Sequence, residues 1–257
     1  MDSPRRAATS VQSLERAFGL LELLANRDGA CTLSELADGS GLAPATIHRL
    51  MATLAQRGYV RRAPGRRYVL GPRLIALGDG ARRAFGSWVT HYLRELVELT
   101  GETANLAVLD SDHVLYVAQA PGKHAMRMFT EPGRRVDPHC TAVGKAMLAR
   151  LSDEEVRALL GRTGMERHTA TTLTTPRALI GQLRKIRSDG YALDEGEQEV
   201  GVRCVAVALD ANPGLSAISV SGPLTRLTDG ALTTIIPALI QVSKTLSAEL
   251  DESDAQS

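Results

Sequence analysis

The chain has 257 residues, of which 44% are hydrophobic and 23% are charged, a composition typical of a soluble globular protein with one large domain or two unequal ones. No apolar run reaches the roughly 18–20 residues of a membrane-spanning helix, and no apolar stretch follows the N-terminal arginines, which argues against a membrane partner and a secretory signal. Cys31, Cys140 and Cys204 are odd in number and widely spaced, so we expect a reducing cytoplasm rather than a disulfide framework.

The net charge of +1 hides an asymmetry along the chain. Residues 1–83 contain 13 basic residues against 7 acidic ones, a net charge of +6, whereas residues 84–257 contain 17 against 22, a net charge of −5. This split predicts a polyanionic partner for the N-terminal third alone. All 13 basic residues there are arginines, which suits bidentate contacts to phosphate or guanine. A compositional bias of the genome would explain the choice of arginine equally well, but not the split.

Two helices are predicted before residue 42. Apolar residues recur every three or four positions from Val11 to Leu24, which predicts an amphipathic helix of about four turns. The sequence from Thr32 to Glu35 has the spacing of a capping box and opens a second, short helix. Gly39 and Gly41 then interrupt the chain.

A third helix is predicted from Pro44, which fits a first helical turn, to Gly58, where a helix usually stops. Its apolar residues recur at helical spacing and form one buried stripe: Ile47, Leu50, Met51 and Leu54. The opposite face is polar or small and consists of Ala45, Thr46, His48, Arg49, Thr53 and Gln56. Apolar contacts therefore hold the helix and leave this second face available.

Two strand-like runs follow, residues 59–62 and 67–70, with a turn at Pro64-Gly65. Helix, short helix, glycine turn, helix and hairpin is the order of a winged helix-turn-helix, in which the third helix enters the DNA major groove. The predicted DNA contacts are Ala45, Thr46, His48 and Arg49 on the helix, with Arg61, Arg62, Arg66 and Arg67 on the wing. A unit of this kind that docks protein instead of DNA is the alternative that the pattern leaves open.

We place a domain boundary in the segment that follows. Pro72 can begin a further helix, with apolar contacts from Leu74, Ile75 and Leu77, but Gly78 and Gly80 make it a weak or bent linker. The predicted organisation is a DNA-binding domain at 1–71, a linker helix at 72–85, a second domain at 86–250 and a polar tail at 251–257.

The second domain mixes strands and helices. Strands are predicted at 105–109, 114–119, 126–129, 191–193, 204–209 and 215–221. Helices are predicted at 85–99, 140–151, 176–188 and 229–250, with one more from a second capping-box pattern at Ser152 to about Leu160. This order indicates an α+β domain with a mainly antiparallel sheet.

Taken together, the chain resembles the isocitrate lyase regulator (IclR) family of bacterial transcription factors from about Ser10 to Leu250. The matching stretches are "VQSLERAFGLLELLA", "TLSELADGSGLAPATIHRLMATLAQRGYV", "YVLGPRLIALG", "HCTAVGKAMLA", "IRSDGYALDEGEQEVGVRCVAVAL" and "AISVSGPLTRLT". The resemblance implies a winged helix, a linker helix and an effector domain with a GAF-like or profilin-like sheet. It also implies dimers or dimers of dimers that pair through the N-terminal and linker segments, bind palindromic operators and in most cases repress.

The resemblance further implies a small-molecule site. Its expected residues are Thr141, Ala142, Val143, Asp194, Cys204, Ser219 and Ser221. Local physics agrees, because the start of the helix at Thr141 offers unpaired amides and a favourable dipole to a carboxylate. Ser219 and Ser221 are two apart on a strand and therefore face the same side. We expect a small oxo- or hydroxy-acid, for which glyoxylate and pyruvate are the family precedents.

Each of these residues also has a simpler interpretation. Ser219 and Ser221 could alternate on a solvated strand, Cys204 could be a small core residue, and Asp194 lies in an acidic run that reads as a loop. Lys145 is interpreted as a surface or interface lysine and is given no role.

No enzyme activity, cofactor or metal site is predicted. Cys140 follows His139 at a helix start, with Asp137 nearby, but adjacent His and Cys side chains rarely reach each other as base and nucleophile. The spacing of His139, Cys140 and Cys204 matches no zinc signature. The sequence leaves open the effector, the target genes and operator sequence, repression or activation, dimer or tetramer, and whether a metal binds.

Overall fold

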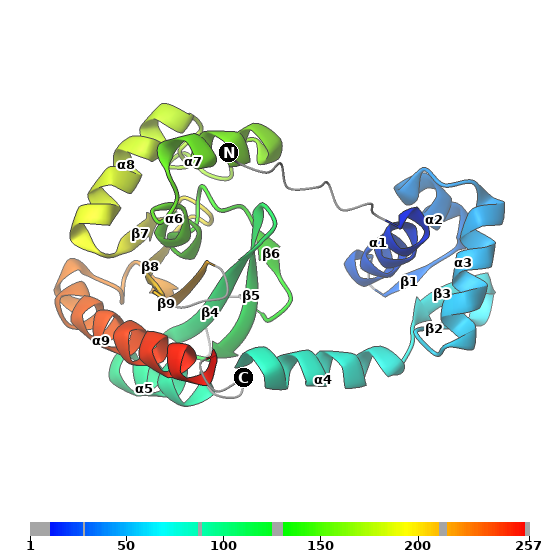
Figure 1. Ribbon diagram of the computed structural model, residues 1–257, viewed down its shortest axis with the longest axis horizontal. Coiled ribbons are helices and arrows are strands. Elements are labelled where there is room, and N and C mark those ends of the chain that lie inside the picture. The colour runs from blue at the N-terminus through cyan, green and yellow to red at the C-terminus, as the bar shows by residue number, and fades with distance from the viewer. Residues whose placement is uncertain (1–10, 28, 87–88, 125–130, 211–214, 255–257) are drawn as a thin grey trace, which may run out of the picture. The chain divides into compact units, whose positions relative to one another are not determined.

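The computed structural model describes residues 11–27, 29–86, 89–124, 131–210 and 215–254. The chain divides into two compact units, Met1–Ala81 and Arg82–Ser257, which we treat separately (Figure 1). The strand predicted at 126–129 lies outside the described residues.

The first unit is a winged helix-turn-helix, as predicted. Its helices are α1 (Gln12–Asn26), α2 (Leu33–Ser40) and α3 (Pro44–Gln56). The wing consists of β2 (Val60–Ala63), a 3₁₀ turn (Pro64–Arg66) and β3 (Arg67–Leu70). A short strand that was not predicted, β1 (Ala30–Cys31), pairs with β3, so that the described part of this sheet has the antiparallel order β1-β3-β2.

Local signals begin and hold these helices. Both halves of the predicted capping box form: Thr32 Oγ1 accepts from the Glu35 N–H at 3.3 Å, and Glu35 Oε2 accepts from the Thr32 N–H at 2.7 Å. These bonds satisfy amides that the start of α2 would otherwise leave unpaired. Ile47 and Met51 of α3 are completely buried, in one cluster with Leu20 and Leu24 of α1 and Leu36 of α2.

The predicted stripe of α1 is only partly buried within the chain. Val11, Leu14 and Phe18 are 58%, 56% and 60% exposed, whereas Leu20 and Leu24 carry the helix into the core. The first two turns therefore present apolar side chains that no described element of the first unit covers. The linker helix α4 (Arg73–Gly86) is likewise continuous through both glycines, and Ile75 and Leu77 on it are exposed rather than packed.

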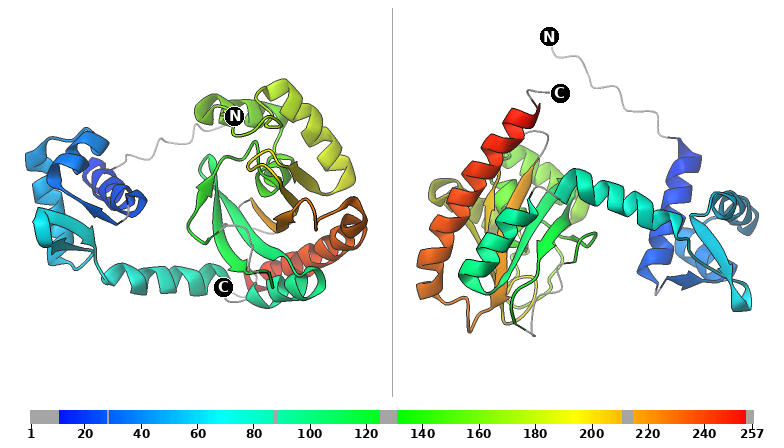
Figure 2. Two further views of the ribbon diagram at one scale, coloured as in Figure 1. Left: turned by 180° about the vertical axis from the view of Figure 1, so that it is seen from behind. Right: turned by 90° about the horizontal axis from the view of Figure 1, so that it is seen from below.

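The second unit is a sheet between two layers of helices (Figures 1 and 2). In its described part the sheet has six antiparallel strands in the order β6-β5-β4-β9-β8-β7. The strands are β4 (Thr103–Asp110), β5 (His113–Ala120), β6 (Arg135–Val136), β7 (Ala192–Glu195), β8 (Val202–Ala208) and β9 (Ser216–Pro223). Helices α5 (Thr90–Thr100) and α9 (Asp229–Asp254) lie side by side on one face. The other face carries α6 (Ala142–Leu148), α7 (Asp153–Thr163) and α8 (Pro176–Asp189).

Strand alternation sorts the side chains between these two layers. On β8, Val205 and Val207 pack in the cluster of α5 and α9, whereas Cys204 and Ala206 face α6. Ser219 and Ser221 of β9 pair across the sheet with Ala206 and Cys204, so they share the α6 side. The register thus places the polar residues of two adjacent strands under one short helix.

Helix α9 is long and apolar enough, by length and composition, to cross a membrane from Asp229 to Leu250. Its buried residues Leu232, Ile235, Leu239 and Leu246 instead pack into the cluster on the sheet, as in the core helix of a globular unit. The helix also continues to Asp254, through residues that the sequence predicted to be a polar tail.

Candidate DNA-binding and effector sites

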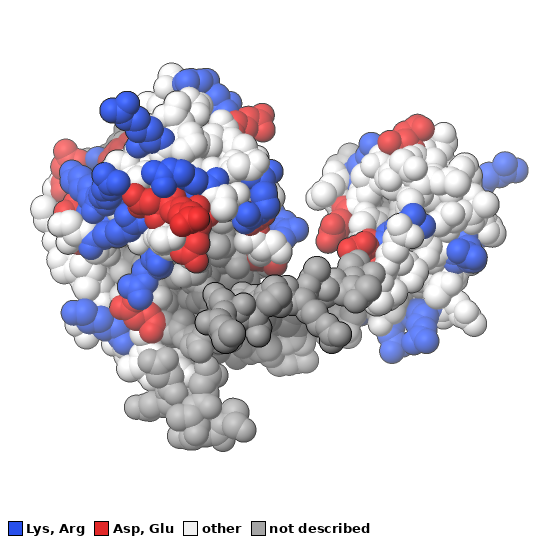
Figure 3. All heavy atoms as spheres, turned by 45° about the horizontal axis from the view of Figure 1, so that its top comes forward, with Lys and Arg blue, Asp and Glu red and all other residues white. Residues whose placement is uncertain are grey.

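The polar face of α3 is exposed. Ala45, His48 and Arg49 are exposed and Thr46 is half-buried, while Ile47 between them is completely buried. Pro44 occupies the first turn, and the N-cap residue Ala43 makes no side-chain capping bond, so the start of the helix is open to a partner. Basic side chains stand out from the surface of this unit in Figure 3.

The four wing arginines are exposed as well. Arg61 and Arg62 lie on β2, and Arg66 sits at the turn with a positive φ of 58° directly after Gly65. Arg62 lies over the Tyr68 ring, 5.8 Å from its centroid. Arg67 donates to the Ala30 carbonyl at 2.7 Å, which ties the base of the wing to β1. The predicted DNA residues therefore lie on two exposed elements, with Arg67 partly engaged in structure.

The second unit contains a small cavity between α6, β5, β8 and β9. It is lined by Tyr116, Arg134, Val136, Thr141, Ala142, Asp194, Gln198, Glu199, Val202, Cys204 and Ser221. Its volume is about 30 Å³, against roughly 10–15 Å³ needed for one water molecule. A ligand of a few heavy atoms is thus the size that fits with little movement of the walls.

Five of the seven predicted effector residues line this cavity: Thr141, Ala142, Asp194, Cys204 and Ser221. Val143 does not, because it is completely buried in the hydrophobic cluster that α6 forms with the sheet, α7 and α8. Ser219 is also buried and shares the face of Ser221 but is not part of the lining.

Sequence reasoning missed the other side of the cavity. Tyr116 and Val136 come from β5 and β6, and Arg134 precedes β6. Arg134 adds a guanidinium, the group best suited to a carboxylate. Its chain position, in a loop before a two-residue strand, carries no local signal that would have singled it out.

The polar walls are held in place by short contacts. Cys204 Sγ lies 3.0 Å from Ser221 Oγ, and Asp194 Oδ1 accepts from the Glu197 N–H at 2.6 Å. Burial raises the pKa of the Asp194 carboxyl to about 7, although the Glu197 amide and the Lys145 ammonium favour its charged form. Burial also raises the pKa of the Cys204 thiol to about 12. Near neutral pH the cavity therefore holds a thiol and a carboxyl that is only partly ionised.

The interpretation of Lys145 as a surface residue was wrong. Every residue of α6 is buried, and the Lys145 side chain is completely inaccessible, where it forms an ion pair with Glu197 Oε1. The lysine cannot reach solvent because its helix lies between the sheet and the layer of α7 and α8. Glu197 is itself only 3% exposed, and its Oε2 has no hydrogen-bond partner among the described residues.

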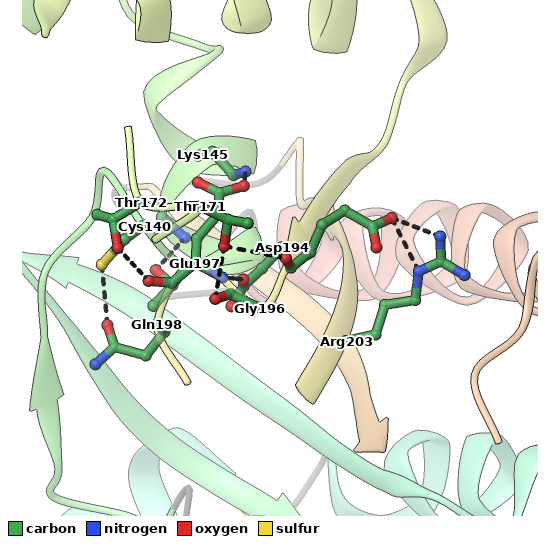
Figure 4. A network of polar contacts seen from close by, with 12 residues as sticks. Cys140, Lys145, Thr171, Thr172, Asp194, Gly196, Glu197, Gln198 and Arg203 are labelled. Carbon is green, nitrogen blue, oxygen red and sulfur yellow. Dashed lines mark hydrogen bonds and ion pairs between the residues drawn. The ribbon is translucent and has the colours of Figure 1, made fainter. Parts of the chain in front are cut away.

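The acidic run, residues 194–197, is a turn held in place by hydrogen bonds and ion pairs (Figure 4). Asp194 lines the cavity, Glu195 binds Arg203 on β8 with an Oε1–Nε distance of 2.9 Å, and Glu197 pairs with Lys145. Thr172 Oγ1 donates to the Glu197 carbonyl at 2.6 Å, and Thr171 Oγ1 to the Gly196 carbonyl at 2.8 Å. These bonds hold the turn that carries Asp194 and Gln198 into the wall of the cavity.

The start of α6 is compact. Thr141 Oγ1 accepts from the Gly144 N–H at 3.2 Å, which caps the first turn of the helix. A Cβ at Gly144 would lie 2.3 Å from the Pro138 carbonyl oxygen, so only glycine lets the preceding loop cross the helix this closely. Residues 140 and 141 belong to this loop, and Ala149 caps the C-terminal end, so the helix is shorter than the predicted 140–151.

Comparison with known proteins decides the family. A model described as "Bacterial transcriptional regulator IclR C-terminal" matches residues 86–248, and one described as "IclR helix-turn-helix domain" matches residues 13–64. The chain belongs to the IclR family of bacterial transcriptional regulators. It therefore combines a DNA-binding helix-turn-helix with an effector domain.

Individual relatives support this family assignment. The chain is 38% identical to the HTH-type transcriptional regulator BhcR of Paracoccus denitrificans (strain Pd 1222), over 92% of this chain and 86% of that protein. It is also 38% identical to the Transcriptional repressor IclR of Escherichia coli (strain K12), over 93% and 89%. A solved IclR regulator from Alicyclobacillus acidocaldarius is 29% identical, with a TM-score of 0.81 over 93% of this chain and 98% of that one. By their names, all three relatives are regulators of transcription.

Proposed function

We propose that this IclR-family protein is a cytoplasmic repressor that binds a palindromic DNA operator as a dimer or dimer of dimers and responds to a small organic acid. The observation that carries the DNA-binding part is the exposed, arginine-bearing face formed by α3 and the wing. Repression is supported by the name of one relative, the Transcriptional repressor IclR, which is 38% identical to this chain.

Self-association is supported by the exposed apolar residues of the first unit. Val11, Leu14 and Phe18 on α1, with Ile75 and Leu77 on α4, are each more than half exposed. Large apolar side chains gathered on two helices favour burial against a partner surface. A two-fold dimer would present two recognition helices to the two half-sites of a palindrome.

Operator binding tests the DNA-binding part directly. We expect Arg49→Ala to weaken binding to the DNA upstream of its own gene by about 1–3 kcal/mol, if Arg49 reads a base edge. Arg177→Ala, an exposed arginine of the second unit, is the matched control and should leave affinity unchanged. Gel shifts at several salt concentrations, with random DNA in parallel, measure both. Equal losses on operator and random DNA would reduce Arg49 to a phosphate contact, and no DNA binding at any salt would favour a protein-docking domain.

The wing is tested in the same titrations. Removing Arg61 or Arg66 should lower the salt slope of binding by about one unit each, because each phosphate contact releases counterions. An unchanged slope would take these arginines out of the interface.

The chemistry of the cavity wall in the second unit supports the small acid as the effector. The wall offers a hydroxyl at Ser221, a thiol at Cys204 and the guanidinium of Arg134. These groups suit the carboxylate and the oxo or hydroxyl group of glyoxylate or pyruvate. The acid acts only if it binds the DNA-competent and DNA-incompetent forms with different affinity.

Thermal shift with glyoxylate and pyruvate tests this assignment, because a ligand that binds the folded state raises its melting temperature. We expect Ser221→Ala and Asp194→Ala to abolish the shift and the change in operator affinity while DNA binding without ligand persists. Ser216→Ala, on the same strand but outside the cavity, should respond normally. If Ser221→Ala and Asp194→Ala also respond normally, the site lies elsewhere.

A further inference from the structure

Three potential metal ligands meet beside the start of α6, although one of them lies 28 positions beyond the nearer of the other two in the sequence. His139 and Cys140 lie in the loop before the helix, and His168 lies in the segment between α7 and α8. Each offers one ligand atom, and these atoms all lie within 4.8 Å of one another. None of the three lines the effector cavity, but Cys140 Sγ donates to Oε1 of Gln198 in the cavity wall at 2.9 Å, so the cluster lies directly beside the cavity and a metal would replace this hydrogen bond.

The state of His139 is unusual for a buried side chain. The ring is completely inaccessible, and its Nε2 lies 3.0 Å from the Glu166 carbonyl oxygen. A carbonyl only accepts hydrogen bonds, so Nε2 donates to it, and in the neutral ring Nδ1 then holds a lone pair. Nδ1 is buried and has no hydrogen-bond partner among the described residues. A buried acceptor without a partner is costly in itself, and a bound ion explains it.

The second histidine has the outer partner that metal-bound histidines commonly have. His168 Nε2 lies 2.9 Å from Asp137 Oδ2, and the His168 side chain is 26% exposed. A carboxylate that accepts from one ring nitrogen fixes the ring and makes the whole imidazole a better ligand. The partial exposure of His168 gives an ion a route in from solvent.

We propose that His139, Cys140 and His168 form a binding site for a zinc-like divalent cation. Two imidazoles and one thiolate are a borderline-soft ligand set that suits zinc, and three protein ligands leave a fourth position for water. Binding transfers the Cys140 thiol proton to solvent, and the sulfur then donates its electron pair to the metal. The cation, the thiolate and the neighbouring Asp137 carboxylate together carry no net charge, which lowers the cost of placing the ion in a mostly buried site.

Cobalt(II) titration of the untagged, metal-stripped full-length protein tests the site. We expect one equivalent of cobalt per chain to produce a thiolate-to-cobalt charge-transfer absorption together with the visible bands of a tetrahedral complex, and zinc to abolish both. Cys140→Ser should remove the charge-transfer absorption. Cys204→Ser, the matched control, should keep it, because that buried thiol lies in the effector cavity instead.

Two further variants keep the test decisive if Cys140→Ser does not fold. His168→Gln changes a partly exposed side chain and should weaken zinc binding at least tenfold in competition with a chromophoric chelator. Asp137→Asn, which alters the outer partner, should weaken it about 10–100-fold. His91→Gln, at a 74% exposed histidine on α5, should have no effect. No charge-transfer absorption in the unmodified protein, its survival in Cys140→Ser, or unchanged zinc affinity in His168→Gln would each overturn the proposal.

Discussion

The buried ion pair of Lys145 and Glu197 allows a stability prediction that can be worked out from the structure. Lys145→Met keeps most of the side-chain volume but removes the ammonium group. The Glu197 carboxylate then remains 3% exposed with neither oxygen paired, because Oε2 already lacks a partner among the described residues. Leaving one charge of a buried pair uncompensated costs about 3–5 kcal/mol.

A second route gives a similar magnitude. The stranded carboxylate can escape its charge by taking up a proton, which for an ordinary glutamate at pH 7 costs about 4 kcal/mol. At pH 5 the same proton costs about 1 kcal/mol, but the neutral carboxyl stays buried without a hydrogen-bond partner, which costs a further ~1–3 kcal/mol. We therefore expect Lys145→Met to lower the free energy of unfolding by about 3–5 kcal/mol at pH 7 and by less at pH 5.

A double variant separates the cost of the unpaired charge from the cost of altered packing. Replacing both partners, as Lys145→Met with Glu197→Leu, removes the stranded charge, and such apolar replacements of buried pairs are often neutral or stabilising. We expect this double variant to recover most of the stability lost by the single one.

Urea unfolding followed by circular dichroism, at pH 7 and pH 5, measures these differences. Because the chain has two compact units, Leu36→Ala is included to identify the transition of the first unit, which it should destabilise by about 2–5 kcal/mol. A loss below about 1 kcal/mol for Lys145→Met at pH 7, or a double variant as unstable as the single one, would refute the reasoning.

Two further predictions concern the same domain. Because the pKa of Asp194 is raised to about 7 by burial, the folded chain holds a proton that the unfolded chain releases near pH 4. The free energy of unfolding should therefore fall by about 4 kcal/mol as pH rises from 4 to 7 and then level off, and Asp194→Asn should remove this component from urea titrations across that range. Gly144→Ala should destabilise by about 1–3 kcal/mol or more, since its Cβ would meet the Pro138 backbone. Gly161→Ala in α7, where an added Cβ has no atom within 4 Å, should stabilise the fold by about 0.5–1 kcal/mol. If the urea midpoints of the two glycine variants shift in the same direction, this reasoning is wrong.

The elements with signals inside a few residues were predictable. Both capping boxes, at Thr32 and Ser152, form as the sequence indicates, because the partners are three residues apart and need nothing from the rest of the fold. The apolar stripe of α3 predicted which face is buried, since Ile47 and Met51 are both inaccessible. The two-residue strands β1 and β6 were missed because so short a run has no periodicity to detect.

The sites depended on distances that the sequence does not express. Cys204 and Ser221 were expected together from the family resemblance, but their 3.0 Å contact exists because the register of β8 and β9 pairs them. Arg134 had no signal at all. His168 also had no local sequence signal, because it lies 28 positions beyond Cys140 in a segment without regular structure.

The sequence by itself determined the kind of fold and the side of each helix that is apolar, because helix starts, stops and periodicity act between near neighbours along the chain. Only the tertiary structure decided that Lys145 is buried, that Phe18 is exposed and that His139, Cys140 and His168 meet. These outcomes depend on which distant segment covers a side chain. That is set by sheet register and helix packing, and no local pattern records it.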